Sequence, residues 1–188
     1  MRPSRWSRQR RMRSPLGTLA VLAAIAVIAG FAALFQPAPE TLVGHATAVD
    51  GDTLRMGLTR VRLTGFDAVE LDQRCINIKG GDWKCGYSAR DFVARLVRDG
   101  QTRCVAEGRD RYGRVLAKCR TETGDLGDAI VRAGWAVADL EYAAALADAR
   151  FNQRGAWIGT FDDPAQWRRS HGGDGFDLWA WLMSLVPR

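Results

Sequence analysis

The feature that most constrains the fold is an apolar run of 20 residues, Leu16 to Phe35, which contains no charged side chain. A helix of this length is about 30 Å long, close to the thickness of the hydrocarbon core of a bilayer. A helix packed on a globular core would keep a polar face, which this run lacks. The sequence therefore predicts a transmembrane helix over residues 15–35.

A basic arm, residues 1–14, precedes the run and holds six arginines but no acidic residue. Without these six arginines the chain has 21 basic and 21 acidic residues, although its formal net charge is +6. Positive charge ahead of a membrane helix favours a cytoplasmic amino terminus. We therefore expect a single-pass protein of the inner (cytoplasmic) membrane, with everything after Gln36 on the periplasmic or other extracytoplasmic side.

The fate of the apolar run has two interpretations. Gly30-Phe31-Ala32 fits the small-x-small pattern of a signal-peptide cleavage site. The run continues through Phe35, however, and the apolar cores of signal peptides are usually about 7 to 15 residues long. This length favours an uncleaved signal-anchor, followed by a proline-containing linker at residues 36–41.

Four cysteines, all beyond the apolar run, agree with an exported domain. Cys104 and Cys119 flank a glycine-containing turn, which predicts that they face each other across a hairpin and form a disulfide. Cys75 and Cys85 would close a separate surface loop. A zinc site is the competing interpretation, and the lack of a Cys-x-x-Cys pair in the sequence counts against it.

Short β-compatible segments and amphipathic segments indicate an α+β domain at residues 42–160. The strands are expected at residues 42–49, 53–57, 60–63, 101–107 and 115–120. The helices are expected at residues 88–98, 125–133 and 140–154, and Ser88 and Asp139 are candidate N-caps of the first and third. A five-stranded β-barrel of the oligonucleotide-binding (OB) type with three helices fits this order best.

The tail, residues 161–188, contains a tryptophan-rich segment at residues 176–186 with apolar side chains at helical spacing. This segment is too short to span a bilayer. Two interpretations stay open for it. One is packing on the core or in the groove of a partner, and the other is shallow insertion at the membrane interface.

Polar residues suited to phosphodiester chemistry form three motifs in and between the expected strands. Carboxylates supply the oxygen ligands that a hard cation such as Ca²⁺ prefers, and a further carboxylate can deprotonate a water molecule. Arginines can hold a phosphate through two parallel hydrogen bonds. Each motif alone is typical of a polar turn, but their ordered combination predicts a phosphodiester-cleaving site. The motifs are Asp50-Gly51-Asp52-Thr53, Arg62 followed by Asp67-Ala68-Val69-Glu70, and Asp110-Arg111-Tyr112-Gly113-Arg114.

On these motifs, the stretch from about Gly44 to Gly159 resembles the thermonuclease (staphylococcal-nuclease-like) family. The resemblance implies an OB-fold barrel with helices and an endonuclease that hydrolyses DNA and RNA at the 5′ oxygen of the phosphodiester. Ca²⁺ is the cofactor that it implies, the substrate is single-stranded DNA or RNA, and we expect no small-molecule cofactor. Nothing in the sequence indicates an oligomeric state.

The resemblance also implies roles for single residues. Glu70 corresponds to the general base, and Arg62 and Arg114 correspond to the two phosphate-binding arginines of the catalytic site. The implied metal ligands are Asp52, Asp67 and the Ala68 carbonyl, with Asp50 acting through water, and Arg111 and Tyr112 are the candidate substrate-binding residues.

Two positions depart from the family pattern. Val69 stands where the family usually has proline, so we expect a less constrained backbone beside Glu70. Asp139 stands where the family often has a tyrosine that contacts substrate, and Tyr142 is the candidate substitute. These departures leave a second function class open, a noncatalytic OB-fold module that binds nucleic acid or protein at the membrane surface.

Overall fold

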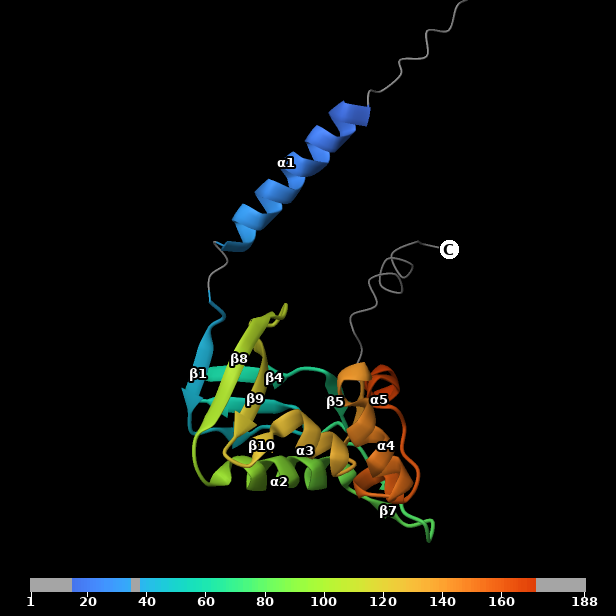
Figure 1. The fold of residues 1–188 in the computed structure, drawn as a ribbon. Coiled ribbons are helices and arrows are strands. Elements are labelled where there is room, and N and C mark those ends of the chain that lie inside the picture. The colour runs from blue at the N-terminus through green and yellow to red at the C-terminus, as the bar shows by residue number, and fades with distance from the viewer. Residues whose placement is uncertain (1–14, 35–37, 172–188) are drawn as a thin grey trace, which may run out of the picture. The chain divides into compact units, whose positions relative to one another are not determined.

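The structure is a computed structural model that describes residues 15–34 and 38–171 (Figure 1). The chain divides into two compact units, residues 1–38 and 39–188, and the division falls within the predicted linker. Three predicted features lie outside the described residues. They are the basic arm, the junction of the apolar run with the linker at residues 35–37, and the tryptophan-rich segment at residues 176–186.

The first unit contains the helix α1 (Pro15–Leu34), which forms over the predicted apolar run. No helix, over the residues described, is long and apolar enough to cross a membrane. The membrane anchor therefore finds no support in the structure and stays a prediction from the sequence.

The second unit is built on one large sheet with the strand order β1-β8-β9-β4-β3-β2, to which β10 adds by pairing with β9. All pairs are antiparallel except β4 with β9, which run parallel. The structure thus confirms a mixed α+β fold. The strands are β1 (Thr41–Gly44), β2 (Thr47–Ala48), β3 (Thr53–Met56), β4 (Thr59–Leu63), β8 (Thr102–Arg109), β9 (Val115–Thr121) and β10 (Gly124–Asp125).

The predicted closed five-stranded barrel is not found, because the sheet has two free edges, β1 and β2. The sequence predicts one strand over residues 42–49, but it is interrupted at His45-Ala46 and its halves pair with different neighbours, β8 and β3. The three peptide links from Gly44 to Thr47 span at most about 11 Å, so the two edges must approach each other at this corner. The sheet is therefore strongly curled, and its edges are connected by the chain rather than by hydrogen bonds.

Two small sheets extend the unit. β5 (Phe66–Ala68) pairs with β11 (Ala136–Ala138), and β6 (Cys75–Ile76) pairs with β7 (Asp82–Trp83). None of these strands is longer than three residues, which is too short for a recognisable alternation of apolar and polar residues.

Helices cover the curled sheet on one side and at one end (Figure 1). Three of them match predicted helices, and the predicted helix at residues 140–154 forms as η1 followed by α4, whereas η2 and the final helix α5 were not predicted. The helices are α2 (Cys85–Arg98), α3 (Leu126–Arg132), η1 (Leu140–Tyr142), α4 (Ala143–Phe151), η2 (Gly155–Ile158) and α5 (Pro164–His171).

The predicted N-cap Ser88 is wrong, whereas Asp139 does hold the N-cap position of a helix, η1. Helix α2 begins at Cys85, three residues before the predicted cap, and the Ser88 hydroxyl donates to the carbonyl of Lys84 inside the first turn. Asp139 precedes η1, but its side chain makes no capping hydrogen bond. Asp125 does cap a helix, since its carboxylate accepts from the backbone N–H of Asp128 at the start of α3.

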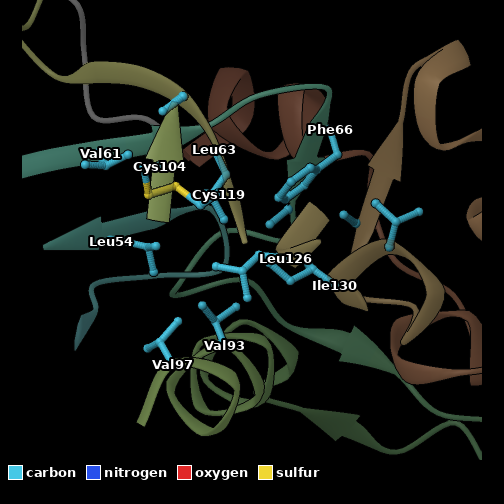
Figure 2. Packing of buried hydrophobic residues seen from close by; sticks show 14 of the residues in the cluster. Leu54, Val61, Leu63, Phe66, Val93, Val97, Cys104, Cys119, Leu126 and Ile130 are labelled. Carbon is cyan, nitrogen blue, oxygen red and sulfur yellow. A yellow bond between two sulfur atoms is a disulfide. The ribbon is translucent and has the colours of Figure 1, made fainter. Parts of the chain in front are cut away.

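The main hydrophobic core lies between the sheet, α2 and α3 (Figure 2). Leu54 and Val61 from the sheet, Val93 from α2 and Ile130 from α3 are all fully buried. Each such side chain contributes about 1.5–3 kcal/mol relative to an exposed one. The core fixes β3 and β4; β4 carries Arg62, and the turn with Asp50 and Asp52 directly precedes β3.

The predicted pairing of all four cysteines agrees with the structure. Cys104 and Cys119 lie directly opposite each other in the β8–β9 pair and are bonded within the main core. Cys75 and Cys85 are bonded in a second, smaller cluster that also contains Val69 and Ala89.

Candidate active site

The Asp50–Thr53 turn leads into β3 and is held by its own first residue. The Asp50 carboxylate accepts hydrogen bonds from the backbone N–H groups of Asp52 at 2.9 Å and Thr53 at 2.6 Å. A Cβ on Gly51 would lie 2.7 Å from the Cβ of Ala68, so the turn packs directly on β5. This turn directs Asp52 inward, where only 5% of it is exposed.

Arg62 joins Asp52 to Asp67. Its position opposite Thr53 in the β3–β4 pair places it beside the turn. Its Nη1 donates to Asp52 Oδ1 at 3.1 Å, and its Nη2 lies 3.0 Å from Asp52 Oδ2 and donates to Asp67 Oδ1 at 2.9 Å. Burial raises the pKa of Asp52 to about 7, although the positive charge of Arg62 opposes this rise.

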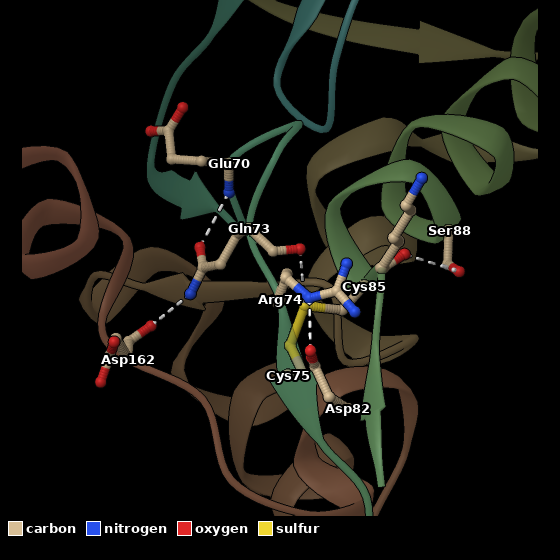
Figure 3. Close-up of a disulfide and its surroundings, with 9 residues drawn as sticks. Glu70, Gln73, Arg74, Cys75, Asp82, Cys85, Ser88 and Asp162 are labelled. Carbon is tan, nitrogen blue, oxygen red and sulfur yellow. Dashed lines mark hydrogen bonds and ion pairs between the residues drawn. A yellow bond between two sulfur atoms is a disulfide. The ribbon is translucent and has the colours of Figure 1, made fainter. Parts of the chain in front are cut away.

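Glu70 lies on a loop that a buried glutamine fixes from behind (Figure 3). Gln73 accepts from the backbone N–H of Glu70 at 2.9 Å, and its amide donates to the Asp162 carbonyl at 2.6 Å. Its own backbone N–H donates to the Glu70 carbonyl at 2.9 Å. The Cys75–Cys85 disulfide lies directly beneath, with Cys85 Sγ 3.4 Å from the Gln73 carbonyl.

Val69 restrains this loop in a way that proline cannot. Its backbone N–H donates to the Trp135 carbonyl at 3.0 Å, continuing the contact between β5 and the start of β11. Proline has no N–H to donate. Val69 therefore holds this backbone through a hydrogen bond that proline could not make.

Arg114 is positioned by Asp110 across the tip of the β8–β9 hairpin. The Asp110 carboxylate accepts from the side-chain Nε of Arg114 at 2.7 Å and from its backbone N–H at 2.9 Å. Tyr112 lies at the same tip with 69% of its surface exposed. Its ring centre is 4.8 Å from the guanidinium carbon of Arg111 and 5.8 Å from that of Arg114.

The predicted residues meet at one cavity of about 170 Å³. Asp67 is not among its lining residues but contacts two of them, Arg62 and Arg168. Arg111 and Tyr112 lie beside the cavity, next to Arg114, and do not line it. The lining residues are Asp50, Gly51, Asp52, Arg62, Ala68, Val69, Glu70, Arg114 and Arg168.

Arg168, on α5, is a site residue that the sequence analysis missed. Its Nη2 donates to Asp67 Oδ2 at 2.7 Å and its Nη1 donates to Asp67 Oδ1 at 3.0 Å. Nη1 also donates to Glu70 Oε1. Gln73 was missed as well. The Arg168–Glu70 and Gln73–Asp162 contacts each join residues about 90–100 positions apart along the chain. No local sequence pattern therefore predicts them.

Tyr142, the candidate for substrate stacking, is excluded from that role because it is buried. Only 8% of it is exposed, its ring packs edge-on against Phe66, and a Cβ on Gly127 would lie 2.5 Å from its hydroxyl. Burial, together with Asp125, raises the pKa of the Tyr142 hydroxyl. Tyr112 is thus the exposed tyrosine closest to the site by its contact with Arg114.

The donor set around Asp52 and Asp67 fits a hard cation. One nitrogen, Arg62 Nη2, lies within 3.0 Å of both carboxylates, so their oxygens converge on a position that a single positive centre can fill. Among the described residues, no group of three or more His, Cys, Asp or Glu is arranged to hold a metal. A cation here would therefore take further oxygen ligands from Ala68, which lines the cavity, and from water.

Comparisons with known proteins agree with the motifs. Succinoglycan biosynthesis protein ExoI from Rhizobium meliloti (strain 1021) is 38% identical over 127 residues, covering 64% of this chain and 66% of that protein. Endonuclease YhcR from Bacillus subtilis (strain 168) is 29% identical over 148 residues, covering 65% of this chain and 12% of that protein. The chain thus spans less than two thirds of either relative.

A family model described as "Staphylococcal nuclease homologue" matches residues 60–158. The match covers more than half of the chain and includes Arg62, Asp67, Glu70 and Arg114. The chain therefore belongs to the family of staphylococcal nuclease homologues.

Proposed function

We propose that this protein is an endonuclease that hydrolyses phosphodiester bonds of single-stranded DNA or RNA and requires Ca²⁺. The observation that carries the proposal is the meeting of Asp50, Asp52 and Glu70 with two proposed phosphate ligands, Arg62 and Arg114, at one cavity of about 170 Å³, with Asp67 bound to Arg62 beside it. Family membership and the name of the Bacillus relative, an endonuclease, support the same reaction.

Glu70 is the proposed general base. Its side chain is 30% exposed, so water can reach it. Its backbone N–H and its carbonyl are both hydrogen-bonded to Gln73. It accepts the proton of the water that attacks the phosphorus atom. Proton transfer to a positioned carboxylate of this kind contributes about 10²–10⁴ in rate.

Arg62 and Arg114 are the proposed phosphate ligands. Each is anchored by a carboxylate, Asp52 and Asp67 for Arg62 and Asp110 for Arg114, so each guanidinium is held in place before substrate binds. Preplaced donors stabilise the additional negative charge of the transition state without reorganisation. Arginine suits this role better than lysine because its planar fork matches two phosphate oxygens.

Asp52, Asp67 and the Ala68 carbonyl would hold Ca²⁺, and Asp50 would act through water. Ca²⁺, when bound, supplies positive charge that polarises the phosphate and offsets its anionic repulsion of the nucleophile. Asp50 keeps the turn closed through its two backbone hydrogen bonds, which leaves Asp52 as the inward-facing carboxylate of the turn.

Arg111 and Tyr112 are the proposed contacts to the rest of the nucleic acid. Tyr112 is exposed beside Arg114, so a base next to the scissile phosphate can stack on its ring. Stacking on aromatic side chains tolerates any base and suits a single-stranded substrate.

We further propose that the amino-terminal segment, the basic arm with the uncharged run at residues 15–35, anchors the enzyme in the inner membrane, with the nuclease unit on the extracytoplasmic side. This proposal rests on the uncharged run and the arginine-rich arm ahead of it. The two disulfides of the second unit are consistent with an oxidising compartment.

A noncatalytic binding module is the second candidate. The Rhizobium relative favours it, because its name refers to succinoglycan biosynthesis rather than to nucleic acid. The pairing of Glu70 with Arg168 favours it too, because the guanidinium occupies one oxygen of the carboxylate that would act as the base.

Cleavage assays with the full, oxidised chain separate the two candidates. Wild-type protein, Glu70→Gln and the control Glu122→Gln, whose side chain lies at a different pocket, are incubated with single-stranded DNA and with RNA, in Ca²⁺ or in chelator. We expect Ca²⁺-dependent cleavage that only Glu70→Gln loses. Absence of cleavage by the folded wild-type protein would favour the binding module.

A further inference from the structure

Arg168 brings a positive charge from outside the family-matched region into the acidic site. The match ends at residue 158, whereas α5 begins at Pro164. Both oxygens of Asp67 accept from Arg168, at 2.7 and 3.0 Å, and Glu70 accepts from it as well. The charge-assisted, two-bonded contact to Asp67 is among the stronger kinds of ion pair in proteins.

This contact opposes the binding of a divalent cation at Asp67. Ca²⁺ binds carboxylate oxygens at about 2.3–2.6 Å. Arg168 uses both oxygens of Asp67, and its own positive charge would repel the metal at short range. Glu70 Oε1 is also engaged, so this oxygen is not free to accept a proton while Arg168 stays in place.

The backbone that carries Arg168 is fastened, whereas its side chain is not enclosed. Thr160 exchanges two backbone hydrogen bonds with Ile76, and the Asp162 carbonyl accepts from Gln73. Asp163 caps α5 by accepting from the backbone N–H of Ala165 at 2.9 Å. The Arg168 side chain is 42% exposed, so it can leave Asp67 by rotation into solvent without displacement of α5.

We propose that Arg168 is an internal competitor of the divalent cation: its guanidinium occupies Asp67 and Glu70 until the metal displaces it. The proposal rests on the metal site of the proposed function. In the metal-free protein Arg168 neutralises the metal ligand and the base together. The concentration of Ca²⁺ that the protein requires is therefore set partly by α5, a segment beyond the family-matched region.

Calorimetric titration of the full, oxidised chain with Ca²⁺, without nucleic acid, tests the proposal. Arg168→Ala and Arg168→Gln remove the competing charge, and Gln keeps much of the side-chain volume. We expect both variants to bind Ca²⁺ about tenfold more tightly than wild type. This factor corresponds to the free energy of the half-exposed ion pairs that Ca²⁺ must break in wild type. The Ca²⁺ affinity of Arg168→Lys should lie between that of wild type and that of these two variants, since lysine keeps the charge but not the planar fork.

Arg169→Ala is the matched control. Arg169 has the same charge on the next position of α5, and in the part of the chain that the structure describes it pairs with neither Asp67 nor Glu70. We expect its Ca²⁺ affinity to equal that of wild type. A thermal melt of each variant shows whether it is folded, and at least one of Arg168→Ala and Arg168→Gln must be folded for the comparison.

Unchanged or weaker Ca²⁺ binding in the folded Arg168 variants overturns the proposal, as does tighter binding in Arg169→Ala to the same degree. The result is independent of the nuclease assay. Tighter Ca²⁺ binding by the Arg168 variants without any cleavage would support the competition and reject the nuclease, whereas cleavage with unchanged affinity would do the reverse.

Discussion

The side-chain oxygen of Gln73 accepts a hydrogen bond from the backbone N–H of Glu70 at 2.9 Å. The amide nitrogen of the same side chain donates to the Asp162 carbonyl at 2.6 Å. Gln73 is fully buried, so water cannot replace either partner if the side chain is lost. One buried amide thus ties the loop that carries the proposed base to the segment that leads into α5.

Gln73→Ala should therefore lower both stability and turnover. It removes the partner of two part-buried backbone groups, each at a cost of up to about 1–3 kcal/mol, and it frees the loop at Glu70. Urea unfolding and kcat, measured where the variant is still folded, check the two effects. Gln101→Ala, at an exposed position before β8, should change neither. A normal kcat in folded Gln73→Ala would mean that the loop holds Glu70 without this bond.

Gly86→Ala tests the same loop from its other side. A Cβ at Gly86 would lie 1.8 Å from the carbonyl oxygen of Glu70 and 2.5 Å from that of Leu71, and both atoms belong to the backbone. The loop must shift, at a cost of about 1–3 kcal/mol for overpacking. We expect a lower melting temperature and a lower kcat. Gly44→Ala, which has open space around its added methyl group, should keep wild-type values.

Much of the site was predictable because its residues lie on local patterns. The Asp-Gly turn before β3 and the hairpin tip before β9 each place a carboxylate beside backbone donors within four residues. Alternation along β3 and β4 sets their register, which brings Arg62 opposite Thr53. Cysteine spacing across the same hairpin identified one disulfide for the same reason.

The remainder depends on contacts that no local pattern encodes. The Arg168 side chain meets its partners, and Gln73 meets Asp162, only after α5 and its approach dock, about 90–100 residues away along the chain. The start of α2 moved from Ser88 to Cys85 because the disulfide and the packing of Gly86 on Glu70 fix the earlier turn. The interruption at His45-Ala46 opened the expected barrel, since the halves of the strand pair with different neighbours.

Arg62→Lys separates charge from geometry. Lysine keeps the positive charge between Asp52 and Asp67 but cannot contact both carboxylates through a planar fork. We expect kcat to fall by about 10²–10³, the usual loss when one preplaced transition-state donor is removed. Arg60→Lys, an exposed position on the same strand, is the control. Equal rates for both variants would show that charge alone suffices at Arg62.

Asp148→Asn should change the pH dependence of stability. Asp148 accepts from Arg154 at 2.6 Å and from Arg132 at 3.2 Å, and chiefly the hydrogen bond from Arg154 holds its pKa below the ordinary 3.8. A lowered carboxyl pKa stabilises the fold above the unfolded-state pKa, and this contribution is lost as the pH falls through the folded-state pKa.

The melting temperature of Asp148→Asn should accordingly lie below that of wild type at pH 7, and the two should converge below pH 3.8. Asp99→Asn, whose side chain is 83% exposed, provides a comparison that removes the same charge. Parallel melting curves for Asp148→Asn and wild type across the whole range would contradict the linkage.

The two disulfides should have similar effects on stability but different effects on activity. They close loops of 10 and 15 residues, so chain entropy assigns each about 3 kcal/mol. Replacing either pair with alanines should lower the free energy of unfolding in urea by a comparable amount.

The Cys75–Cys85 bond, however, lies against Gln73, which holds Glu70, whereas the Cys104–Cys119 bond lies within the main core. Only loss of the first should therefore lower kcat at a temperature where both variants are folded. Equal kcat values in the two double variants would show that the hydrogen bonds of Gln73 hold the base without the covalent support.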